Sequence, residues 1–310
     1  MKKARDCFEQ AVKEDPAFAL GYVGQADCCL QIRHNWGIDR DGNLEKAKVL
    51  ISKGLALEPD LAEAHATKGE MHLGEYQSRL AEEEFRRAIE LKPSYAYAHV
   101  WYFGLLLNSL RWDEARVEIE KALVLDPLSP TIHWNLGEYY YGRKEYEKAI
   151  DPYKRAIELG NPDAHSVLAM AYGRLKMYDD MRRESAIWVD NVQGVYPMAK
   201  PIAESMDAYL KGDKVTVKKL LPQLEMMFTK DGTLDAYWIG VAHFFLGEIN
   251  EGFEWLERSY SRREPILQNI AYNGDIDEVL GDPRYLDSSG DWDWTKPSEK
   301  VRISDLRRAG

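Results

Sequence analysis

The chain has 310 residues, a net charge of −11 at neutral pH and a hydrophobic content of 45%. An acidic chain without a basic stripe is not expected to bind nucleic acid, and its longest apolar runs are too short to cross a membrane. Three cysteines, two of them adjacent, do not form a disulfide framework, and no apolar run follows Met1, so we expect a cytoplasmic protein without a signal peptide.

A period of 34 residues organises most of the chain. Ala81, Ala115 and Ala149 are separated by this interval, and so are the prolines Pro59, Pro93 and Pro127. Around them, apolar residues recur at the i, i+3, i+4 and i+7 spacing of helices, small residues stand where two helices must approach closely, and proline ends each unit. The period therefore predicts an all-α fold built from copied helix pairs that stack on one another.

The predicted units follow one another along the chain. They are a half repeat that holds a second helix alone (1–16), a repeat lengthened near 31–44 (17–61), four regular repeats (62–95, 96–129, 130–161 and 162–195), a degenerate repeat (196–232), a late repeat (233–265), and a cap with an irregular tail (266–310).

The clearest unit carries His133-x-x-Leu136-Gly137-x-x-Tyr140, followed by Ala149-x-x-x-Tyr153. This pattern resembles the tetratricopeptide repeat. The resemblance implies a right-handed α-α superhelix whose first helices line a concave groove.

A second resemblance is to the repeat arrays at the carboxyl end of microbial regulators with adenylate-cyclase-like, kinase-like or winged-helix modules, and it implies the regulatory arm of a signalling system. It is carried by Ala19–Gln25, Leu61–His65, Ala98–Tyr102, Asp126–Pro130, Phe253–Arg258 and Asp282–Tyr285.

The resemblance also implies which positions face the groove. The residues at these positions are Asp27, Glu63, Glu70, Tyr97, Asn108, Trp134, Glu138, Tyr141, Tyr237 and Phe244. Aromatic anchors with acidic neighbours in a concave surface suit a peptide that carries basic and apolar residues. We therefore expect a non-catalytic protein–protein interaction scaffold, although some of these rings could instead pack between helices.

Other site chemistries fit the sequence less well. Histidine recurs at one repeat position (His65, His99, His133 and His165), but equivalent residues on stacked helices lie about 8–10 Å apart and cannot converge on one metal ion. We interpret these rings as packing groups, and we interpret Cys28 and Cys29 as buried thiols. The sequence shows no catalytic motif, so no cofactor or metal is expected.

Two further functions stay open. The chain could be an enzyme in which the tail around Asp291–Trp294 closes over the groove, with Glu70 and Glu138 buried and their pKa values shifted. It could also self-associate, with the tail or the first helix filling a neighbour's groove.

Overall fold

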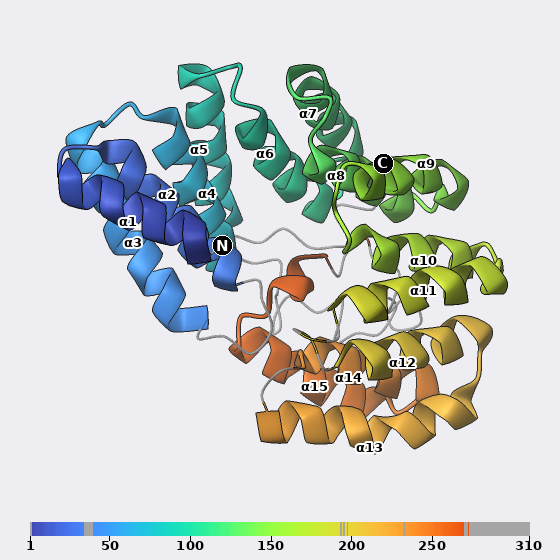
Figure 1. Cartoon of the computed structure of the whole chain (residues 1–310). Coiled ribbons are helices and arrows are strands. Elements are labelled where there is room, and N and C mark those ends of the chain that lie inside the picture. The colour runs from blue at the N-terminus through green and yellow to red at the C-terminus, as the bar shows by residue number, and fades with distance from the viewer. Residues whose placement is uncertain are drawn as a thin grey trace. The chain divides into compact units, whose positions relative to one another are not determined.

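The computed structural model describes residues 2–33, 40–192, 194, 196, 198–231, 234–269 and 272. These residues form fifteen α-helices and one short 3-10 helix without any strand, which confirms the predicted all-α fold class (Figure 1). They divide into two compact units, of which the first ends at Leu125 and the second begins at Asp126. Among the helices described, none combines the length and apolar character that crossing a membrane requires.

The first unit is a series of helices in which each packs against the next. The helices are α1 (Lys2–Glu14), α2 (Ala19–Arg33), α3 (Arg40–Leu57), α4 (Ala62–Gly74), α5 (Ser78–Leu91), α6 (Ala96–Asn108) and α7 (Trp112–Leu125). The first helices of successive pairs, α2, α4 and α6, also contact one another, which places their inner faces side by side. Part of the expected lengthening near 31–44 falls at 34–39, outside the described residues.

The second unit continues the same alternation of helices. It contains α8 (Pro130–Gly142), α9 (Tyr146–Glu158), α10 (Ala164–Arg174), α11 (Tyr178–Val192), α12 (Ala199–Lys211), α13 (Lys214–Asp231), α14 (Ala236–Leu246), α15 (Ile249–Ser261) and the 3-10 helix Pro265–Asn269. Apart from this 3-10 helix and Tyr272, the expected capping helix near 266–281 and the tail to 310 lie outside the described residues.

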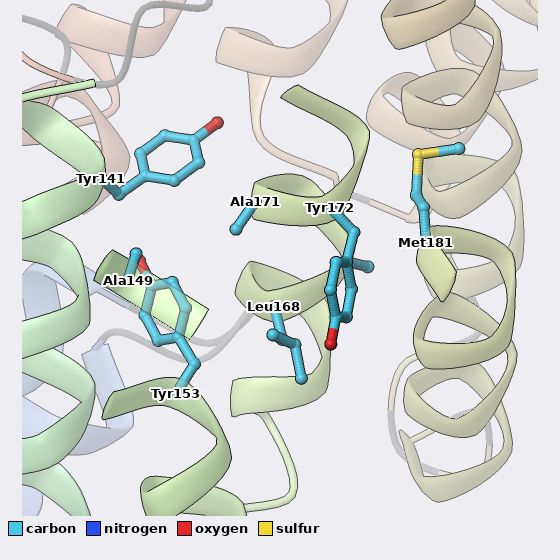
Figure 2. Packing of buried hydrophobic residues seen from close by; sticks show 8 residues of the cluster. Tyr141, Ala149, Tyr153, Leu168, Ala171, Tyr172 and Met181 are labelled. Carbon is cyan, nitrogen blue, oxygen red and sulfur yellow. The ribbon is translucent and has the colours of Figure 1, made fainter. Parts of the chain in front are cut away.

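In the pairs α4/α5 and α8/α9, a glycine on the first helix faces an aromatic ring on the second. A Cβ atom added to Gly69 would lie 2.4 Å from the ring of Phe85, and one added to Gly137 would lie 2.3 Å from the ring of Tyr153. The helices therefore approach as closely as glycine allows, and the rings fill the space between them. Figure 2 shows the buried cluster around Tyr153 in the second unit, to which α8, α9, α10 and α11 contribute residues.

The turns within the pairs share one backbone geometry. Tyr76, Leu110, Lys144 and Lys176 adopt positive φ angles of 57–62° directly after a first helix. In each turn the following N–H donates to the carbonyl five residues back, as Gln77 does to His72. This is the Schellman closure of a helix end, and in the last two pairs glycine takes the left-handed position.

The recurring histidines join the two helices of their pairs through polar contacts. His99 Nδ1 lies 2.5 Å from the carboxylate of Glu118 on α7, and its Nε2 lies 3.0 Å from the carbonyl oxygen of Pro93. His65 makes the same two contacts, with Glu84 and with the carbonyl of Pro59. These rings are bridges as well as packing groups, so the interpretation from sequence was incomplete.

The same bridge varies in the other pairs. His165 contacts Glu184 at 2.7 Å, whereas in the pair of α8 and α9 the glutamate position holds Pro152, and His133 bonds to the carbonyl of Pro127. Each ring contacts groups of its own pair, and the described part of the chain contains no group of three potential metal ligands.

The last pair is closed by a glutamate that follows it. Glu264 is fully buried, and its carboxylate accepts hydrogen bonds from the backbone N–H groups of Ala236 and Tyr237 at the start of α14 and from the hydroxyl of Ser259. A carboxylate at a helix N-terminus satisfies free N–H groups and complements the helix dipole. It therefore ties the end of α15 back to the start of α14.

Gly104, in the middle of α6, has free space beside its Cα atom, unlike Gly69. A Cβ atom at Gly104 would meet no other atom within 4 Å, whereas one at Gly69 would press into the Phe85 ring. We expect Gly104→Ala to raise the free energy of unfolding by about 0.5–1 kcal/mol, because alanine has the higher helix propensity. Gly69→Ala should lower it by about 1–3 kcal/mol through overpacking. Urea denaturation followed by circular dichroism measures both, and an equal loss of stability would contradict the prediction.

Candidate functional site

Three predicted acids meet on the inner side of α2 and α4. Asp27 on α2 accepts a 2.6 Å hydrogen bond from the hydroxyl of Thr67 on α4, and Thr67 is fully buried. Burial raises the pKa of the Asp27 carboxyl; the Thr67 hydrogen bond lowers it, and the negative charges of Glu70 and Glu63 raise it again, to about 7 overall. Asp27 is therefore part protonated at neutral pH, and a cation that approached it would favour its ionised form.

An aromatic wall begins beside these acids at the start of α6. The ring centroids of Tyr95 and Tyr97 lie 6.4 Å apart, and those of Tyr97 and Trp101 lie 6.0 Å apart. Burial raises the pKa of the Tyr95 hydroxyl, and the charges of Asp27 and Glu63 raise it further, which shows that this ring lies close to the acids. Tyr97 is 41% exposed, so its ring is available to a ligand.

We call this surface the acid–aromatic face, and it already accommodates one ammonium group. It is made of Asp27, Glu63, Glu70, Tyr95, Tyr97 and Trp101. The side chain of Lys92, just before α6, places Nζ 2.5 Å from Glu63 Oε1 and 5.5 Å from the centroid of the Tyr95 ring. A carboxylate and a ring face together form a suitable environment for a cation.

In the second unit, Trp134, Glu138 and Tyr141 follow one another along α8. The carboxylate of Glu138 accepts a 2.7 Å hydrogen bond from the hydroxyl of Tyr153 and a longer one, at 3.5 Å, from that of Tyr272. Trp134 is half-buried and packs against the edge of the cluster shown in Figure 2. Glu138 is thus engaged by two tyrosines of its own unit.

Comparison with known protein families identifies the repeat. Residues 105–164 match the family model described as tetratricopeptide repeat. This segment of the chain, from α6 to the start of α10, therefore carries the tetratricopeptide repeat. Repeats of this type mediate protein–protein interactions.

Curated relatives with these repeats match only part of the chain. The type IV pilus assembly protein PilF of Pseudomonas aeruginosa is 30% identical over 132 residues, which are 42% of this chain and 52% of PilF. Superkiller complex protein 3 of Mus musculus is 30% identical over 147 residues, which are 44% of this chain and 9% of that protein. The chain thus spans about half of the first relative and a small part of the second.

Solved structures with a similar arrangement include the APC/C hetero-tetramer Cut9–Hcn1. The TM-score is 0.57 at 14% sequence identity, and the alignment covers 83% of this chain and 45% of that chain. At this identity the likeness concerns the fold of the tetratricopeptide repeats alone.

Three rings that the repeat positions assigned to the groove lie in the packed interior. Tyr141 is 3% exposed, Tyr237 0% and Phe244 2%, so none of them forms part of an accessible surface, and their assignment to the groove was wrong. Phe244 lies against α15, where a Cβ atom on Gly252 would be 2.4 Å from its ring, and the hydroxyl of Tyr141 accepts a hydrogen bond from Arg174. The repeat positions identify residues on first helices, but they do not show which of these residues a neighbouring helix covers.

The other predicted site residues divide between two places. Asp27, Glu63, Glu70 and Tyr97 belong to the acid–aromatic face, whereas Asn108 lies at the far end of α6, about 16 Å along the helix from Tyr97. Sequence reasoning missed Thr67, Tyr95 and Lys92, which stand at positions that the repeat pattern does not assign to the groove. The segment Asp291–Trp294, proposed as an enzyme lid, falls outside the described residues.

Proposed function

We propose that this protein is a non-catalytic interaction scaffold that binds a peptide segment with basic and apolar residues on the acid–aromatic face. The observation that carries the proposal is the position of Lys92, whose ammonium group contacts both Glu63 and the ring of Tyr95. A lysine or arginine of a partner would find the same two kinds of group at Asp27, Glu70 and Tyr97. Trp134 on α8 is proposed as a separate contact within the second unit.

The charge of the molecule supports a basic partner. The net charge of −11 attracts cationic segments and raises their rate of encounter, with the largest effect at low ionic strength. The aromatic rings supply apolar contact area at a small cost in conformational entropy. We infer that binding combines an ionic contact with the stacking of an apolar side chain on Tyr97.

The cellular setting is part of the proposal. Cys7, Cys28 and Cys29 are free thiols, which fits a reducing compartment such as the cytoplasm. The likeness of six segments to the arrays of microbial regulators supports a regulatory arm of a signalling system as the setting. In that setting the peptide would belong to a regulated partner protein.

The test begins with a selection of random 12-residue peptides displayed on phage against the full chain. We expect enrichment of peptides that contain lysine or arginine beside leucine or aromatic residues. Tyr97→Ala and Glu70→Gln should each weaken binding of the best synthetic peptide by about tenfold in fluorescence anisotropy, the size of effect seen at anchor residues.

The matched control is Glu83→Gln, which removes the same charge from an exposed position on α5. It should leave the dissociation constant unchanged. Binding that is insensitive to Tyr97→Ala and Glu70→Gln, or equally sensitive to Glu83→Gln, would contradict the proposal.

A further inference from the structure

Lys92 fills a cation subsite at the edge of the acid–aromatic face. Its Nζ atom lies 2.5 Å from Glu63 Oε1 and 5.5 Å from the centroid of the Tyr95 ring, which are the two contacts of a bound ammonium group. The side chain of Glu63 is 16% exposed, whereas that of Lys92 is 49% exposed. The carboxylate therefore belongs to the packed surface, and the lysine reaches it from the solvent side on a flexible stem.

The two walls of the subsite are held by contacts that do not involve the Lys92 side chain. The Tyr95 ring packs against the buried alanines Ala66 of α4, Ala88 of α5 and Ala98 of α6. Glu63 lies in the first turn of α4, where a carboxylate complements the helix dipole. The subsite therefore keeps its two walls when the lysine side chain leaves it.

The repeat does not require a lysine at this position. Lys92 precedes the proline that ends its repeat, and the equivalent residues of two other repeats are the acids Glu58 and Asp126. In all three turns the backbone carbonyl of this residue accepts a hydrogen bond from the N–H group three residues later. The turn thus closes in the same way with an acidic residue, so the contact between Lys92 and Glu63 is not needed to form it.

A lysine tethered in this way competes with any cation that a bound peptide brings. Because Lys92 is part of the chain, its effective concentration at the subsite is of order millimolar, and a lysine of the peptide offers no stronger contact. Arginine does, since its planar guanidinium can bond a carboxylate through two N–H groups and can stack on an aromatic ring. The competition therefore disfavours lysine more than arginine.

We propose that Lys92 makes the acid–aromatic face selective for arginine, because the guanidinium of a bound peptide displaces Lys92 from Glu63 and Tyr95 whereas a peptide lysine does not. The displaced ammonium group moves into water, where its charge is hydrated. This inference rests on the proposed peptide function and specifies the side chain that the partner must carry.

The test compares two fluorescein-labelled peptides, in which leucine alternates either with arginine or with lysine, for binding to the full chain in fluorescence anisotropy. We expect the arginine peptide to bind about tenfold more tightly. Lys92→Gln should raise the affinity for the lysine peptide about tenfold and that for the arginine peptide less, so that the preference is lost. Glu63→Gln should also remove the preference, in this case by weakening the binding of the arginine peptide.

The matched control is Lys68→Gln, which removes the same charge from α4, where Lys68 pairs with Glu84. It should change the affinity for both peptides by the same small factor and keep the preference. A preference that survives Lys92→Gln, or that Lys68→Gln removes as well, would overturn the inference. Equal binding of both peptides to the wild type that Tyr97→Ala abolishes would overturn the inference and leave the proposed function standing, whereas binding of neither peptide to any of these proteins would overturn both.

Discussion

Asp27→Asn is expected to remove most of a pH dependence that the wild-type protein shows between about pH 4 and 7. The folded-state pKa of Asp27 is raised from 3.8 to about 7, mainly by burial, so the folded state binds this proton more tightly than the unfolded state. The stabilising effect of the proton is complete below pH 4 and is lost as the pH rises through the folded-state pKa. The loss amounts to as much as about 4 kcal/mol above pH 8.

Asparagine keeps an oxygen that can accept the hydrogen bond from Thr67, but it carries no charge. The variant should therefore be more stable than the wild type above pH 7 and similar to it near pH 4. Urea denaturation at a series of pH values gives the two curves, and Asp60→Asn, at an exposed position that pairs with Arg87, is the control. Parallel curves for Asp27→Asn and the wild type would show that Asp27 is not the responsible group.

The second large effect is expected for His99→Ala in the pair of α6 and α7. The imidazole of His99 is 3% exposed, and its loss leaves the carboxylate of Glu118 without this partner inside the pair. Burial raises the pKa of the Glu118 carboxyl, but hydrogen bonds from His99 and Lys121 outweigh burial and lower it overall. Breaking such a buried pair from one side costs about 3 kcal/mol.

His133→Ala is the matched comparison, because the position opposite His133 holds Pro152 and its ring bonds to the backbone carbonyl of Pro127. Its loss should cost about 1 kcal/mol, the typical value of a single hydrogen bond. Native-state hydrogen exchange resolves the two effects, with faster exchange in α6 and α7 for His99→Ala. Equal destabilisation by the two substitutions would show that the carboxylate contact adds nothing.

The helix pairs could be predicted from the sequence because the small residues at the close contacts between helices recur at a fixed interval. Ala81, Ala115 and Ala149 are fully buried at close helix contacts. Their role can be inferred from the local sequence pattern, without knowledge of residues that are distant in the chain. The polar role of the histidines could not be predicted in the same way. An imidazole fits both a packing position and a bridge, and the choice depends on Glu84 or Glu118 on the other helix of the pair.

The candidate site was predicted in part. Asp27, Glu63 and Tyr97 come together because α2, α4 and α6 lie side by side, which the repeat implies. The pKa of Asp27 is raised mainly by burial and further by the charges of Glu70 and Glu63, against the hydrogen bond from Thr67, and neither the burial nor that hydrogen bond has a marker in the sequence. Tyr237 and Phe244 were misplaced for the converse reason, since an aromatic residue on a first helix can face either a ligand or the next helix.

The tight turns within the pairs bear on how such a chain can evolve. Tyr76, Leu110, Lys144 and Lys176 hold the same left-handed conformation with three different side chains, although a residue other than glycine costs of order 1 kcal/mol there. The backbone hydrogen bonds that close the end of the first helix determine the geometry of the turn. The identity of the side chain at the position with positive φ therefore matters little. A repeat can therefore be duplicated and change in sequence at this turn without a change in its backbone structure. A sequence search that uses glycine to locate such turns would miss these four.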